Sequence, residues 1–176
     1  MATTVTDATL TSVITDSVSL NGTTYGSTNT LSITTQDEVY QRIMKVPAFK
    51  TSVQDFITIM SATSSPSSGG DVDIAQFRYA RFTNLDDTYP LYLKVTDTNG
   101  VCDDTAPTNT YCVKIPAGCS YLITSDTWYI NEGDVRGSDV TGSAALTPPA
   151  YWTVWGVGEE AALENGVEME VFVSCK

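Results

Sequence analysis

Apolar and polar residues alternate in short segments along most of this chain, as they do in β-strands that bury one face. The clearest segment is residues 167–175, where Val167, Met169, Val171 and Val173 share one face. Similar segments cover residues 9–20, 27–34, 37–46, 55–60, 77–95, 111–115, 119–124, 127–130 and 151–157. The sequence predicts an all-β fold, a single jelly-roll-like β-sandwich of about eight to ten strands with long loops.

Turn residues between these segments predict how some strands connect. Asn21-Gly22 separates residues 9–20 from residues 27–34, and both turn residues accept positive φ, so a hairpin is expected there. Residues 37–46 could form a strand or a short helix. We expect a strand, because both faces alternate and Pro47 ends the run.

Residues 77–95, FRYARFTNLDDTYPLYLKV, are the expected centre of the fold. They predict two strands joined by a polar turn at residues 84–88, in a central hairpin with apolar residues on both faces. One face of the first strand would carry Phe77, Tyr79 and Arg81, and the other Ala80 and Phe82. A second hairpin is predicted around residues 116–118, between residues 111–115 and 119–124.

The length of 176 residues suits one domain. Residues 1–8 are expected to form a polar N-terminal arm, and residues 9–176 the single β-sandwich. Residues 62–70 and 131–150, rich in Ser, Gly and Pro, are expected to be exposed loops. No apolar run is long enough to span a bilayer, and the first residues lack the layout of a secretory signal.

Acidic residues dominate the charge, which is formally −12 and unevenly placed. Residues 1–50 hold four acids and three bases, whereas residues 97–176 hold twelve acids and three bases. Such a surface repels phosphate backbones, so nucleic-acid binding is not expected. Solubility explains the charge most simply, and a surface for calcium or a basic partner is the alternative. Asp97, Asp103 and Asp104 lack the EF-hand pattern, and cation binding by them stays open.

Histidine is absent from the chain. This excludes Ser-His-Asp and Cys-His nucleophilic systems and His-ligated metal sites within the chain. The cysteines Cys102, Cys112, Cys119 and Cys175 lack C-x-x-C spacing and are interpreted as reduced thiols in or near the core. Two other pairings stay open, Cys112 with Cys119 across the second hairpin and Cys102 with Cys112 around a loop. We expect no enzyme activity and no cofactor.

Two groups of side chains are candidates for contacts with a partner or ligand. Trp128, Trp152 and Trp155 could form a sugar-binding platform, although such residues more often pack in a core. The strand arginines are expected to pair with acids within the fold or across a subunit contact; they are Arg42, Arg78 and Arg81. Glycosidases need two acids that face one cleft. Adjacent acids such as Asp86-Asp87 lie in apparent loops, so they are interpreted as solvated turn residues.

Three motifs support a resemblance: SLNGTTYGSTNTLSITTQDEVYQRI at residues 19–43, FRYARFTNLDDTYPLYLKV at residues 77–95, and IPAG at residues 115–118. They resemble small all-β virion structural proteins of tailed bacteriophages, particularly phages of marine bacteria and cyanobacteria. The resemblance covers most of residues 9–125. It implies a virion component of jelly-roll or sandwich type, assembled in the host cytoplasm.

The resemblance predicts a capsid decoration or cement protein that binds and stabilises the head shell. Its expected partners are the major capsid protein or other virion proteins, together with further copies of the chain, a trimer being one possibility. Neither nucleic acid nor a membrane is an expected partner. The alternative is a tail or fibre component, either an adaptor or a receptor- or carbohydrate-binding module that uses the tryptophans, and a hydrolase is a distant third.

Overall fold

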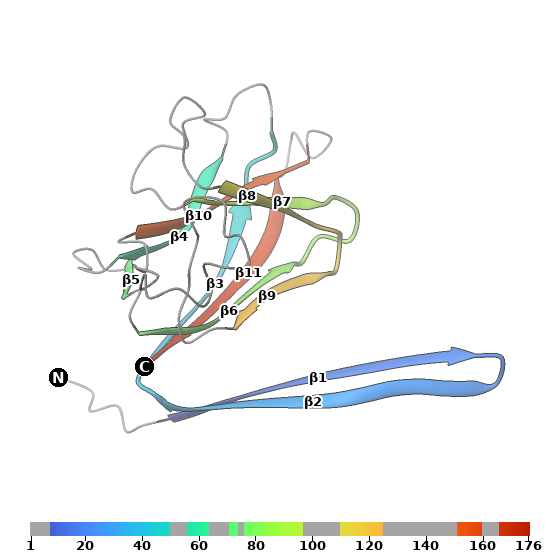
Figure 1. Ribbon diagram of the computed structural model, residues 1–176. Coiled ribbons are helices and arrows are strands. Elements are labelled where there is room, and N and C mark those ends of the chain that lie inside the picture. The colour runs from blue at the N-terminus through green and yellow to red at the C-terminus, as the bar shows by residue number, and fades with distance from the viewer. Residues whose placement is uncertain are drawn as a thin grey trace, which may run out of the picture.

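The computed structural model describes residues 8–49, 56–63, 71–73, 76–96, 110–124, 151–159 and 166–176 (Figure 1). Within them the regular elements are all strands: β1 (Ala8–Leu20), β2 (Thr23–Gln36), β3 (Glu38–Val46), β4 (Ile57–Thr63), β5 (Asp71–Asp73), β6 (Phe77–Asn84), β7 (Leu91–Thr96), β8 (Thr110–Ile115), β9 (Ser120–Thr124), β10 (Tyr151–Gly158) and β11 (Val167–Cys175). The predicted all-β class is confirmed. Ala62 and Thr63 form the buried end of β4, which corrects the predicted start of the loop at residue 62.

Two sheets stacked face to face form the body of the protein (Figure 1). One has five strands in the order β5-β4-β10-β7-β8, and the other has four in the order β3-β11-β6-β9. Neighbouring strands are antiparallel, except that β4 and β5 run parallel. With β5 set aside, the other eight strands can be numbered 1 to 8 along the chain, starting from β3. The four-stranded sheet then has the order 1-8-3-6, and the five-stranded sheet without β5 has the order 2-7-4-5.

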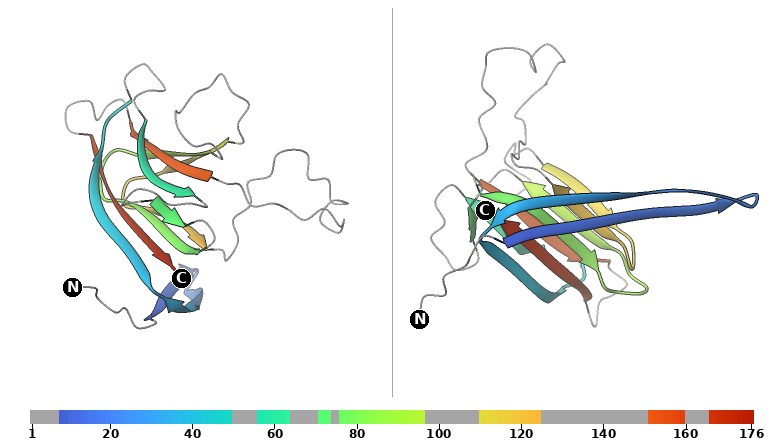
Figure 2. Two further views of the ribbon diagram at one scale, coloured as in Figure 1. Left: turned by 90° about the vertical axis from the view of Figure 1, so that its left-hand side faces the viewer. Right: turned by 90° about the horizontal axis from the view of Figure 1, so that it is seen from below.

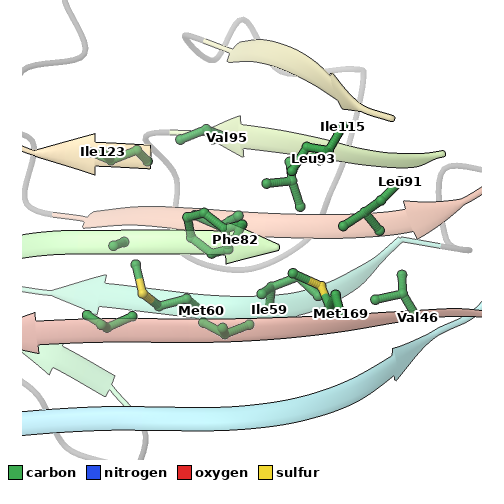
Figure 3. Packing of buried hydrophobic residues seen from close by; sticks show 14 of the residues in the cluster. Val46, Ile59, Met60, Phe82, Leu91, Leu93, Val95, Ile115, Ile123 and Met169 are labelled. Carbon is green, nitrogen blue, oxygen red and sulfur yellow. The ribbon is translucent and has the colours of Figure 1, made fainter. Parts of the chain in front are cut away.

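The core lies between these sheets (Figure 3). From β11 it receives Val167, Met169, Val171 and Val173, all fully buried, so the predicted alternation is confirmed. Phe82 of β6, Leu93 of β7 and Ile59 of β4 belong to the same buried cluster. Burying a side chain of this size stabilises the fold by about 1.5–3 kcal/mol, so the two sheets hold each other through this layer.

Residues 77–95 do not form the predicted hairpin. β6 pairs with β11 and β9 in the four-stranded sheet, whereas β7 pairs with β10 and β8 in the five-stranded sheet. Residues 85–90 therefore carry the chain from one sheet to the other as an arch. The apolar pattern predicted two strands correctly, but their side chains meet across the core and their backbones do not bond to each other.

The second predicted hairpin is also an arch. β8 pairs with β7, and β9 pairs with β6, so residues 116–119 cross between the sheets directly beside the first arch. The two crossings are bonded together: the Gly118 amide donates to the Asp86 carbonyl at 3.0 Å, and the Asn84 amide donates to the Cys119 carbonyl at 2.9 Å. Cys112 consequently lies on β8 and Cys119 lies in the crossing at residues 116–119. Both thiols are free and exposed.

The side chain of Asn84 joins the two arches from inside. It is fully buried, and its Nδ2 donates to the carbonyls of Tyr89 at 2.9 Å and Ile115 at 3.1 Å. Its Oδ1 accepts from the backbone amide of Asp86 at 3.0 Å. One amide side chain thus satisfies backbone groups on both crossings, as buried polar groups require.

A bulge corrects the predicted faces of β6. The pairing with β11 shifts register between Ser174 and Cys175, where Tyr79 faces Ser174 but Phe77 faces Cys175. One extra residue on a bulged strand turns the following side chains to the opposite face. Phe77 therefore joins Ala80 and Phe82 in the core, although simple alternation placed it on the other face.

The predicted hairpin at residues 9–34 is confirmed and is longer than expected. β1 and β2 pair along their length, and the turn residues Asn21 and Gly22 have φ of 52° and 79°. At a rise of about 3.4 Å per residue, such strands extend for roughly 40 Å. The hairpin crosses beneath the four-stranded sheet and projects well beyond it (Figure 2).

The cysteines differ in burial, which predicts a difference in reactivity. Cys175 is buried, and burial raises the pKa of its thiol to about 12, so almost no reactive thiolate exists at pH 8. Cys102 lies outside the described residues, so the test uses a Cys102→Ser variant. In this variant a thiol reagent at pH 8 should label Cys112 and Cys119 at once. Cys175 should react only in denaturant. Rapid labelling of all three would contradict this placement.

Candidate interaction surface

The β1–β2 hairpin has two chemically different faces, because its register sorts the side chains. One face, here the apolar hairpin face, carries Leu10, Ile14, Val18 and Leu20 of β1 together with Tyr25, Leu31 and Ile33 of β2. The facing polar pair Asp16 and Ser27 lies on the same face, between Ile14 and Val18. The opposite face pairs Thr11 with Ser32, Thr15 with Thr28, and Ser19 with Thr24. On that face Val13 is the large apolar residue.

The base of the apolar hairpin face lies against the protein's own four-stranded sheet. Leu10, Leu31 and Ile33 are half-buried there, and the hydroxyl oxygens of Ser12 and Tyr79 lie 3.5 Å apart. At the junction with β3, the buried Ser174 hydroxyl donates to Oε1 of buried Gln36 at 2.6 Å. These contacts fix the direction in which the hairpin leaves the body.

The outer half of the same face is exposed. Val18 is 59% exposed, Leu20 60% and Tyr25 56%, and all three lie near the turn. The apolar hairpin face therefore runs from a covered base to an uncovered tip. The exposed tip was not predicted from the sequence. Alternation at residues 9–20 predicts a strand with a buried face, but it does not indicate which part of the protein covers that face.

Polar side chains on the outer face of the four-stranded sheet form a cluster around Glu170. Arg81 donates to Oε2 of Glu170 at 2.7 Å, and Gln41 donates to Oε1 at 2.6 Å. The Gln41 hydrogen bond, helped by Arg81, holds the pKa of Glu170 below its ordinary value. The Arg81 guanidinium also lies 5.9 Å from the centre of the Phe172 ring.

A groove of about 300 Å³ separates this cluster from the hairpin base. Leu10, Ser12 and Val13 line it on one side, and Tyr79, Arg81 and Phe172 on the other. The rings of Phe172 and Tyr79 pack at nearly a right angle, 79° between their planes, with centres 5.9 Å apart. The groove is therefore a mixed aromatic and polar surface.

Edge strand β3 carries a second exposed apolar surface. Its outward side chains include Val39, 57% exposed, and Ile43, 66% exposed, with Lys45 next along the same face. We call these three residues the β3 patch. The chain's own hairpin leaves the β3 patch uncovered.

The three predicted arginines take different positions. Arg81 pairs with an acid, as expected, in the Glu170 cluster. Arg42 donates instead to the carbonyl of Ile59 at 2.9 Å and lies 5.4 Å from the Tyr40 ring centre, so it ties β3 to β4 of the opposite sheet. Arg78 donates to the carbonyl of Phe77 at 2.7 Å.

The remaining predicted site residues lie wholly or partly outside the described residues. Trp152 and Trp155 belong to β10, but their side chains lie outside the described part, as does the whole of Trp128. Cys102, Asp97, Asp103 and Asp104 are outside it too, as are residues 1–7, 64–70 and 131–150. The sugar platform, the cation site, the arm and the loops therefore stay predictions.

A second hollow lies beside the five-stranded sheet. It has a volume of about 310 Å³ and is lined by Phe49, Phe56, Leu93 and Val157. At its rim the Tyr92 hydroxyl donates to Oε2 of Glu159 at 2.6 Å, and this bond raises the pKa of Tyr92. The hollow is chiefly apolar and shows no pair of facing acids among its lining residues.

No protein-family model, curated protein or solved structure matches this chain. Across the described ranges, no helix is long and apolar enough to cross a membrane. In that same part of the chain, no three His, Cys, Asp or Glu residues are grouped so that they could hold a metal ion.

Proposed function

We propose that this protein is a structural component of a tailed-phage virion, a decoration or cement protein of the head built on a jelly roll. The strand order carries the proposal. Facing sheets in the orders 1-8-3-6 and 2-7-4-5 are those expected for two interleaved Greek keys. Jelly rolls recur in viral capsid domains, and the sequence motifs at residues 19–43, 77–95 and 115–118 resemble phage virion proteins.

The physical character of the surface supports an assembly role. Decoration proteins bind an assembled shell and stabilise it by mass action, which requires contact surfaces and no chemistry. This protein presents exposed apolar residues on a projecting hairpin and on an edge strand, Val18, Leu20 and Ile43 among them. Its net charge of −12 keeps a protein made in many copies soluble before it binds.

Binding to purified heads tests the proposal. Purified protein is mixed with expanded heads of the cognate phage that lack it, and bound copies per shell are counted by quantitative mass spectrometry. We expect saturable binding of hundreds of copies and a higher melting temperature of the shell. Purified tails serve as the matched control. Absence of head binding with excess protein would refute a decoration role, and binding to tails at a dozen copies or fewer would indicate the tail alternative.

A further inference from the structure

We propose that the tip of the apolar hairpin face, formed by Ile14, Val18, Leu20 and Tyr25, docks on the β3 patch of a second copy of this chain. The inference deepens the assembly role and rests on it for its biological setting. The occupant of the tip is another copy, and the contact joins two different surfaces of the molecule.

The first argument is the continuity of the apolar hairpin face. Its base is already half-buried on the chain's own four-stranded sheet, through Leu10, Leu31 and Ile33. Beyond the Asp16–Ser27 pair the same face becomes apolar again at Val18 and Tyr25. The strands that carry these residues run past the edge of that sheet (Figure 2). An isolated two-stranded hairpin is only marginally stable in water, so the projecting half needs a further layer to cover it.

The second argument is charge. Residues 8–36 contain a single charged side chain, Asp16, in a chain whose net charge is −12. Two acidic copies therefore approach with least repulsion through the hairpin. Lys45 of the β3 patch is a cation that can face the Asp16 carboxylate of the arriving hairpin, and Glu168 lies directly across from it on β11.

The third argument is the match between the two exposed surfaces. Val39 and Ile43 are four positions apart on one face of a strand, and Ile14 and Val18 have the same spacing on the hairpin. Aliphatic side chains at equal spacing on two extended segments can pack in register. Because the tip and the β3 patch belong to different parts of the molecule, every copy can both give a hairpin and receive one.

Sedimentation velocity of the purified full chain, without heads, measures the association. A Val18→Thr/Leu20→Thr variant removes apolar surface from the tip and keeps residues suited to strands, and Ile43→Thr does the same at the β3 patch. We expect either change to raise the dissociation constant at least tenfold. Val13→Thr is the matched control: Val13 is 58% exposed, like Val18, but lies on the threonine face, so its variant should associate normally.

Mixing the two defective variants identifies the contact. The Ile43→Thr copy retains a normal tip, and the Val18→Thr/Leu20→Thr copy retains a normal β3 patch, so their mixture should form a heterodimer that neither forms alone. Circular dichroism confirms that each variant is folded. A wild type that stays monomeric at 100 times the concentration used for head binding, a tip variant that associates normally, or a mixture without heterodimers would each overturn the inference.

The two proposals fail separately. Self-association of the expected kind without head binding would refute the decoration role and leave the contact between copies intact. Saturable head binding by a protein that is monomeric, and whose binding is unchanged by Val18→Thr/Leu20→Thr, would refute the contact and leave the decoration role intact.

Discussion

Replacing Asn84 by leucine is expected to lower the free energy of unfolding by about 2–4 kcal/mol, because it leaves buried backbone groups of both arches without partners. The amide side chain donates to the carbonyls of Tyr89 and Ile115 and accepts from the amide of Asp86. Leucine fills a similar volume but offers none of these bonds. The predicted loss is therefore one of hydrogen bonding and not of packing.

Urea unfolding followed by tryptophan fluorescence measures this change. Thr83→Val is the matched control, since Thr83 precedes Asn84 in β6 and its hydroxyl lies 2.9 Å from that of Ser120 in an exposed bond. That variant should change the free energy of unfolding by less than about 0.5 kcal/mol. Equal effects of the two substitutions would show that Asn84 does not join the arches.

Replacing Phe82 by alanine is expected to cost about 3–5 kcal/mol, because it opens a cavity where the sheets meet. Phe82 is fully buried between side chains of both sheets (Figure 3). The ring lies in the shared core, so its removal weakens both sheets at once. The effect should appear as a lower urea midpoint with an unchanged dependence on denaturant.

Phe172→Ala provides the comparison, since Phe172 lies opposite Arg81 on the outer face of the same sheet and is half-buried. Its loss should cost about 1 kcal/mol, because the space that it leaves is open to solvent. If Phe172→Ala proved as damaging as Phe82→Ala, the assignment of inner and outer faces would be wrong.

The alternation of side chains predicted the strands well but not their partners. On β11 it identified the buried face, since Val167, Met169, Val171 and Val173 lie in the core whichever strands lie beside them. On β6 and β7 it predicted a hairpin, although an arch buries the same side chains. Periodicity records the face that is buried, whereas pairing depends on the turn, where Asn84 and Asp86 bond to residues of another crossing.

The candidate surface was harder to predict for a related reason. Arg81 and Glu170 are 89 positions apart in the sequence, and nothing local to either indicates the pair. Leu10 and Leu20 belong to one alternating pattern, yet the first is half-buried and the second is 60% exposed. A detectable signal was the near absence of charge in residues 8–36 of an otherwise acidic chain.

The position of the last strands has a consequence for synthesis of the protein. β11 lies between β3 and β6, and β10 lies between β4 and β7, so each sheet is completed by a strand from the final part of this chain. While the ribosome is still translating residues 1–150, neither sheet can close, whereas the local β1–β2 hairpin can already form. Nascent chains therefore gain their folded body, and with it the β3 patch, only after β10 and β11 have been synthesised, which delays assembly until both sheets are complete.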